Sequence, residues 1–279
     1  MKVVATGELL LHPQATTEDI VWRMLHKIKA EDPEVLLLAG DLAYGVQGFR
    51  RVLQLARAVM PEVRIGVAPG PVDVYSDPSV VATTRELHDK VLPACAKEAG
   101  AIWLPTEVLK ANGFLFVGTL GWTDYGAAPE GYDIAAHRKD HPDATRVDWG
   151  AEDGVVAHGF AERLLSLLEA HSKQTLQAIV VSGCPLGLRQ IPPKTHPLAA
   201  GMRCNAKLGE RVYSHSGLVG MVSAGLFGDG VSAEFLGVRQ VTCPSTLKVP
   251  GYVVMNCDHN EHPAITEVRL VTAQHWGAQ

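Results

Sequence analysis

The feature that most constrains the fold is a series of short apolar runs, each of which stops at a loop containing glycine. We expect strands in these runs, at residues 3–6, 35–39, 64–68, 114–119, 179–182 and 218–224. The runs are nearly continuous in Val, Leu and Ile, as in strands buried on both faces. Segments between them place residues such as Phe49, Val52 and Leu53 on one helix face. The sequence therefore predicts an α/β fold, and a more strand-rich C-terminal part adds expected strands at 238–242, 253–256 and 265–271.

Length and composition limit the classes of protein that this chain can be. Its 279 residues, without internal repeat or low-complexity linker, predict one domain over residues 1–279, with a possible lid or insertion at 123–149. A net charge of −5 gives no support for nucleic-acid binding, and no stretch approaches 18 consecutive apolar residues, so no membrane span is expected. Five cysteines without CxxC spacing indicate reduced thiols in a cytoplasmic protein. The oligomeric state is left open.

The loops after the first six strands contain the candidate functional residues. They read GELLLHP, GDLAYG, PGPVD, GWTDYG, SGCPLG and AGLFGDG. Because ligands of α/β sheets bind outside the carboxyl ends of the strands, we expect these loops to converge on one cleft. Asp41 is placed at such an end, directly after the apolar run LLLAG. A carboxylate in this position usually serves a metal ion or a substrate.

The order and spacing of these loops resemble the calcineurin-like metallophosphoesterase superfamily over most of the chain. That family carries Asp-x-His, Gly-Asp and Gly-Asn-His-Asp after its first three strands, then a His at a later strand end and Gly-His-x-His after a further strand. The corresponding segments here are VVATGELLL, LLLAGDLAYG, VAPGPVDVYSD, IVVSGCP and VSAGLFGDG. The resemblance implies a four-layer αββα sandwich, in which two mixed β-sheets pack together and helices flank them.

The departures from the family pattern fall on the metal ligands. Asp41 keeps the bridging Asp, Asp73 keeps the last Asp of the third motif, and Glu8 replaces the first Asp. The other positions carry side chains without a donor atom; they are Leu10, Pro71, Val72, Gly183, Leu226 and Gly228. A two-metal site needs several nitrogen and oxygen donors per cation. We therefore expect a degenerate member of the family without metal or cofactor. The alternative is a weak Mg²⁺ site held by the carboxylates of Glu8 and Asp41.

The carboxylates that remain are the first candidates for chemistry. Two close acids in a partly apolar cleft do not both ionise easily, so we predict that Glu8 and Asp41 share a proton or that a base such as Arg189 or Arg203 neutralises one of them. Asp41, Glu8 and Asp73 are candidate acid–base groups.

Two further sets of residues are candidates for chemistry in the same cleft. Cys184, beside the lost His of the later strand end, is a candidate nucleophile, although an inert buried thiol is the commoner state. His137 and His141 in HRKDH are four residues apart, but Pro142 follows and no third ligand is evident. A solvated loop is therefore favoured over a metal site for this segment.

The apolar replacements allow two interpretations of the cleft. They either plug the old site as core, which is the usual role of such residues, or form the floor of an apolar pocket with a few polar groups. The residues predicted to line it are Leu10, Pro71, Val72, Trp122, Asp124, Gly183, Leu226, Phe227, Gly228 and Asp229.

Two functions follow as hypotheses. The first is a pseudoenzyme, in which the vestigial cleft binds a small molecule or a protein partner and serves binding or regulation. The second is a repurposed, metal-independent enzyme that acts on a small organic molecule through Asp41, Glu8 or Asp73. Phosphoesterase activity of the usual metal-dependent kind is not expected in either case.

Overall fold

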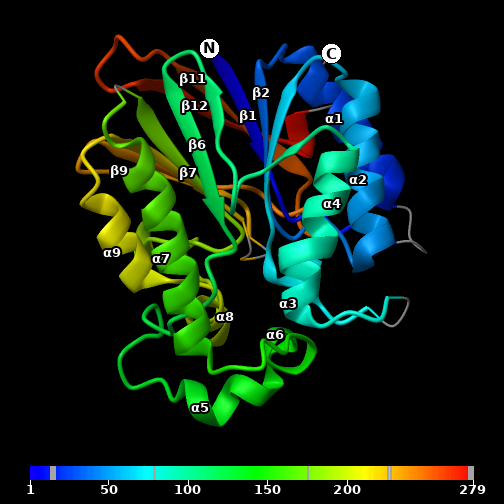
Figure 1. Ribbon diagram of the computed structural model, residues 1–279, viewed down its shortest axis with the longest axis vertical. Helices are drawn as coiled ribbons and strands as arrows, with labels where there is room; N and C mark the ends of the chain where they lie inside the picture. Colours follow the sequence, from blue (N-terminus) through cyan, green and yellow to red (C-terminus); the bar gives the residue numbers. More distant parts are fainter. Residues whose placement is uncertain (13–16, 78–79, 175, 225, 227, 276–279) are drawn as a thin grey trace.

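Two mixed β-sheets pack face to face between two layers of helices in the computed structural model (Figure 1). The structure describes residues 1–12, 17–77, 80–174, 176–224, 226 and 228–275. Within them each sheet has six strands. The first sheet, in spatial order, is β12 (Ile265–Thr272), β11 (Gly251–Cys257), β1 (Lys2–Thr6), β2 (Val35–Ala39), β3 (Arg64–Ala68) and β4 (Ile102–Trp103). The second is β5 (Leu109–Ala111), β6 (Phe114–Thr119), β7 (Gln177–Ser182), β8 (Leu218–Ser223), β10 (Val238–Thr242) and β9 (Val231–Phe235).

The helices form the outer layers. Helices α1, α2 and α4 lie on one side of the sandwich and α7 and α9 on the other (Figure 1). The bounds are α1 Thr17–Ala30, α2 Gly45–Val59, α3 Thr84–Glu86, α4 Leu92–Glu98, α5 Ile134–His137, α6 Pro142–Arg146, α7 Asp153–His171, α8 Pro197–Met202 and α9 Ala206–Tyr213. No helix within the described ranges is long and apolar enough to cross a membrane.

The strands are apolar on both faces because both faces are covered. In β2, Leu36 and Leu38 pack among residues of the covering helices. Val35, Leu37 and Ala39 of the same strand pack between the two sheets. The α/β sandwich predicted from the sequence is therefore confirmed, and its central strands begin and end within two residues of the expected positions.

The loops after β2, β3 and β7 meet backbone to backbone. A Cβ atom on Gly40, which has φ +87°, would lie 2.7 Å from the Cα atom of Gly183 and from the amide nitrogen of Gly70. A Cβ atom on Gly183 would lie only 2.0 Å from the carbonyl oxygen of Pro69. The strand-end loops converge as the sequence predicts, but so closely that glycine is required where they touch.

The segment at 123–149, expected as a lid or insertion, lies at the end of the sandwich toward which the β6 arrow points (Figure 1). It is bound to the rest of the chain by backbone groups. The amide of Ser76 donates to the carbonyl of Arg146, and the amide of Asp148 donates to Oγ1 of Thr84. The segment is thereby fixed across the converging loops.

Candidate functional site

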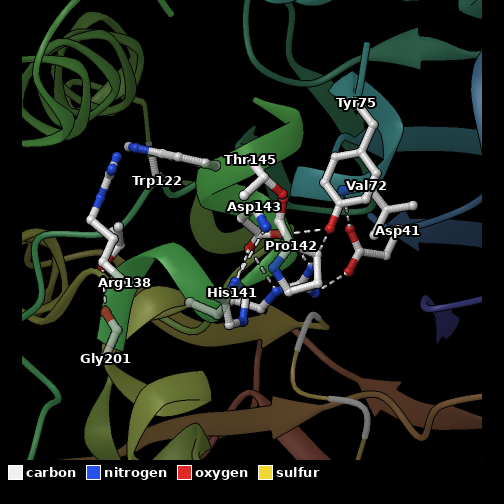
Figure 2. Close-up of polar contacts among 12 residues, drawn as sticks. Asp41, Val72, Tyr75, Trp122, Arg138, His141, Pro142, Asp143, Thr145 and Gly201 are labelled. Atoms are coloured by element: carbon white, nitrogen blue, oxygen red, sulfur yellow. Dashed lines mark hydrogen bonds and ion pairs between the residues drawn. The ribbon is translucent and has the colours of Figure 1, made fainter. Parts of the chain in front are cut away.

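A buried cluster of charged side chains lies at these loops (Figure 2). Its centre is the Arg203 guanidinium, which is 1% exposed. Nη1 of Arg203 donates to Oδ2 of Asp41 over 2.5 Å. Nε and Nη2 donate to the two carboxylate oxygens of Asp143, each over 2.8 Å. Such a bidentate, charge-assisted contact is among the strongest and most directional side-chain interactions.

A tyrosine hydroxyl completes the cluster. Oη of Tyr75 donates to Oδ1 of Asp143 over 2.5 Å and lies 3.4 Å from Nη2 of Arg203. Figure 2 shows Asp41 and Tyr75 on one side of the cluster and Asp143 with His141 on the other. The two carboxylates are fully buried. One cation therefore serves two acids that water cannot reach.

Three distant parts of the chain supply the three charges. Asp41 follows β2, Asp143 is the second residue of α6, and Arg203 follows α8. The backbone amide of Val72 donates to Oδ1 of Asp41 over 2.8 Å, so both oxygens of Asp41 accept hydrogen bonds. The amide of Arg203 itself donates to the carbonyl of Ala199, which fixes the residue at the end of its helix.

The charges shift the pKa values in opposite directions. Burial alone would raise the pKa of Asp143, but the bidentate Arg203 outweighs burial and holds this pKa below its usual value. Burial raises the pKa of Asp41, and the Arg203 charge opposes the rise. The prediction that a base such as Arg203 neutralises Asp41 is confirmed by their contact.

The other two candidate acids are held by backbone amides. Oδ1 of Asp73 accepts from the amides of Leu42 and Ala43, and Oδ2 accepts from the amide of Gly70. Burial and the nearby Asp41 charge raise the pKa of Asp73 to about 8, against the effect of these donors. Oε1 of Glu8 accepts from the amide of Leu226 over 2.5 Å, and Glu8 is fully buried.

The backbone around these acids is strained. Glu8, Leu10 and Asp41 have φ angles of +47°, +50° and +52°. Non-glycine residues seldom adopt this left-handed conformation, and bulky ones such as leucine almost never do without compensation. The amide of Leu10 donates to the carbonyl of Asp41, which holds the two loops together in this geometry. At position 10 this strained backbone carries an apolar side chain.

Most of the predicted lining residues are core. Leu10 and Val72, each 1% exposed, pack with Tyr75 in a small apolar cluster. Trp122 is 1% and Leu226 6% exposed. Three further residues of the set are buried as well, namely Pro71, Gly183 and Gly228. Burial therefore favours the interpretation of a plugged cleft over that of an open pocket.

The remaining predicted residues lie apart from the cluster or outside its chemistry. Asp124 accepts from the amides that begin α9, and Asp229 is exposed. Phe227 lies outside the described residues. Cys184 is fully buried, and burial raises the pKa of its thiol well above the usual value. A reactive thiolate is not supported at this position.

The expectation of a solvated loop at HRKDH is wrong for His141. His141 is 8% exposed, and its Nδ1 accepts from the amide of Asp143 at the start of α6. His137 is exposed, as expected. Asp143 was missed by sequence reasoning because it is in a polar segment without periodicity. The need of Arg203 for an acidic partner becomes visible only once its burial in the fold is known.

The residues at the cluster do not fit a two-metal site. Both oxygens of Asp41 already accept donors from protein groups, and a side chain on Gly183 would collide with the Pro69 carbonyl. Arg203 places a fixed positive charge where a cation would have to bind. Among the residues that the structure describes, no group of three or more His, Cys, Asp or Glu side chains is placed to hold a metal ion.

The fold is shared with phosphoesterases of known structure. A phosphopantetheinyl hydrolase from Mycobacterium tuberculosis superposes with a TM-score of 0.71 at 17% identity, over 88% of this chain and 89% of that one. This chain has the fold of the calcineurin-like metallophosphoesterases. A dimetal phosphatase from Danio rerio superposes with a TM-score of 0.60 at 11% identity, over 98% of both chains. A purple acid phosphatase from yellow lupin superposes with a TM-score of 0.53 at 11% identity, over 93% of this chain and 50% of that one. No family model matches the sequence, and a comparison of the sequence with curated proteins found no match.

These likenesses confirm the resemblance at the level of the fold. At identities below 20% they carry over no activity, since one fold supports many functions. The function has to be argued from the residues of this chain.

Proposed function

We propose that this chain is a non-catalytic binding protein on the metallophosphoesterase fold, without a two-metal centre for phosphoester hydrolysis. The observation that carries the proposal is the Arg203 guanidinium between Asp41 and Asp143. In the fold family the residue at the Asp41 position bridges two cations, which requires its oxygens to face metal ions. Here those oxygens face a guanidinium and a backbone amide.

The alternative of a metal-independent enzyme receives less support. A general acid or base has to reach its substrate within hydrogen-bond distance. Asp41 and Glu8 are fully buried and Asp73 is 2% exposed. The alternative stays a prediction, as do a partner in the vestigial cleft and the cytoplasmic location.

Metal analysis and a hydrolysis assay test the proposal together. We expect purified protein, expressed with Mn²⁺ and Zn²⁺ in the medium, to carry no stoichiometric transition metal. We expect EDTA to leave the melting temperature unchanged, and p-nitrophenyl phosphate to be hydrolysed no faster than by a buffer blank with Mn²⁺. The control is Asp41→Asn, because hydrolysis by a contaminating phosphatase would be the same in this variant as in the wild type. Two tightly bound metal ions, or metal-dependent hydrolysis abolished by Asp41→Asn, would overturn the proposal.

A further inference from the structure

A pocket of about 240 Å³ lies where α7 meets the segment around α3, and it shares no residue with the charged cluster. Three stretches of the chain line it, and they come together only in the fold. Helix α7 supplies Gly159, Phe160 and Arg163, the segment around α3 supplies Arg85 and Asp89, and Trp149 follows the end of α6.

The backbone between α3 and α4 is unusual. Leu87–Val91 forms a turn of π-helix, a conformation that is rare in proteins and frequent at functional sites. In this turn Nδ1 of His88 lies 2.7 Å from Oδ1 of Asp89. Burial lowers the pKa of His88, so its ring is neutral near neutral pH. The buried His88 therefore holds the Asp89 carboxylate in place and adds no charge to the pocket.

The charges at the pocket are two guanidiniums and one carboxylate, and solvent reaches all three. The side chain of Arg163 is 40% exposed and that of Asp89 is 35% exposed, and Arg85 is exposed as well. Nη1 of Arg163 donates to Oδ1 of Asp89 over 3.3 Å, and Nη2 of Arg85 donates to the carbonyl of Trp149 over 3.4 Å. The lining therefore carries one positive charge that no acid in it balances.

One edge of the Arg163 guanidinium is available to a ligand. Within the described part of the chain, its Nε and Nη2 groups make no hydrogen bond, since the contact with Asp89 uses Nη1. Nε and Nη2 form the edge with which Arg203 holds both oxygens of Asp143. Such an edge fits a carboxylate through two parallel, charge-assisted hydrogen bonds.

A glycine inside α7 leaves the pocket open on one side. Gly159 lies away from both ends of Asp153–His171, where glycine makes a helix less stable than alanine does. A Cβ atom on Gly159 would meet no atom within 4 Å, so packing within the protein does not require glycine there. The absence of a side chain is explained if another molecule occupies this space.

Apolar surface adjoins the charges of the pocket. Val155 is 64% exposed, and the rings of Trp149 and Phe160 meet edge to face with centroids 5.3 Å apart. The guanidinium carbon of Arg163 lies 6.0 Å from the centroid of Phe160. The volume is below the range of about 300–1,000 Å³ that suits drug-sized ligands. A fitting ligand is therefore small and joins an anionic group to an apolar body.

We propose that this pocket binds a small aromatic carboxylate. The carboxylate pairs with the free edge of Arg163, and the ring lies over the backbone at Gly159, beside Val155 and Phe160. The inference goes beyond the proposed function and does not depend on it, because the pocket and the charged cluster have no residue in common.

Fluorine NMR with p-fluorobenzoate tests this site. Two ligand controls separate its parts: p-fluorobenzamide keeps the ring without the charge, and fluoroacetate keeps the charge without the ring. The test variants are Gly159→Leu, which fills the open space, and Arg163→Met, which removes the guanidinium. Gly154→Leu is the matched control, because a Cβ atom on Gly154 in α7 also meets no atom within 4 Å, and this residue does not line the pocket.

We expect the p-fluorobenzoate signal to broaden saturably with the wild-type protein, and both ligand controls to bind about tenfold more weakly or less. The affinity for p-fluorobenzoate should fall by about tenfold or more in Gly159→Leu and Arg163→Met and stay unchanged in Gly154→Leu. All three variants should fold. Leucine favours a helix more than glycine does, and the ion pair lost in Arg163→Met is partly exposed and contributes little to stability.

Each of three results would overturn the inference: no saturable broadening with the wild type, equal affinity for p-fluorobenzamide, or an unchanged affinity in Gly159→Leu or Arg163→Met. The proposed function is tested separately, because none of these measurements involves a metal ion or hydrolysis.

Discussion

Replacing Arg203 by Met tests whether the guanidinium is the counter-charge of the cluster. Methionine keeps much of the side-chain volume but leaves the carboxylates of Asp41 and Asp143 buried without a cation. Removal of one partner from a buried ion pair costs about 3–5 kcal/mol. For a chain of 279 residues the entropy of unfolding is about 0.6 kcal/mol per kelvin, so the melting temperature should fall by about 5–9 °C.

The size of this loss depends on the charge of the acids, and a combined variant separates charge from packing. In a background with Asp41→Asn and Asp143→Asn, both buried carboxylates of the cluster are replaced by neutral carboxamides. There the same Arg203→Met change should cost less than about 1.5 kcal/mol, the scale of ordinary hydrogen bonds. Arg203→Lys is the control that keeps the charge but not the bidentate geometry, and it should fall between wild type and Arg203→Met.

The pH dependence gives the reasoning a second test. In the wild type Arg203 holds the pKa of Asp143 low, so this carboxylate adds stability above its unfolded pKa and the added stability is lost as pH falls. Without Arg203 both buried carboxyls have raised pKa values and bind protons more readily folded than unfolded. The loss of unfolding free energy in Arg203→Met relative to the wild type, measured by urea unfolding, should therefore become smaller as pH falls from 7 to 5. A deficit below about 1 kcal/mol, or one independent of pH, would refute the argument.

Two further predictions concern the converging loops and a buried histidine. Gly183→Ala should lower the free energy of unfolding by about 3 kcal/mol or more, because its Cβ atom would lie 2.0 Å from the Pro69 carbonyl oxygen. The control Gly159→Ala should be neutral or stabilising in the same thermal melts. An unchanged melting temperature of Gly183→Ala would contradict the observed packing. Burial lowers the pKa of His88, against the effect of its contact with Asp89, so the unfolded state binds the proton first and the wild type should lose stability as pH falls below about 6.5. His88→Phe should remove this part of the pH dependence in urea unfolding at pH 7 and pH 5. An unaltered dependence would show that folding does not shift the pKa of His88 and would contradict the prediction.

The central strands were predictable because burial on both faces leaves a signal in the sequence itself. β2, β3 and β6 begin and end as expected, since each is mostly apolar and leads into a loop that contains glycine. β9 was missed because it is an edge strand with alternating exposed residues, and β4 because it has only two residues. Short and half-exposed strands are defined by their neighbours rather than by their own composition.

The site was predictable only in part, for a related reason. The position of Asp41 follows from the strand that precedes it, and Arg203 could be named as a candidate base from the chemistry that a buried acid requires. Asp143 could not be named, because 60 residues separate it from Arg203 and its own segment is polar and irregular. Its burial results from tertiary contacts alone.

The position of Asp41 also explains why a fixed cation suits this fold. The end of β2 delivers a carboxylate into a place where three loops touch and water is excluded, and a buried carboxylate there needs a positive partner. Arg203 supplies the charge, and Asp143 on the 123–149 segment holds the guanidinium in a fixed direction. A histidine introduced at Gly183 alone would meet both the Pro69 carbonyl and a site that already contains a cation. Single-residue restoration of the family's ligands should therefore destabilise the protein without creating a metal site.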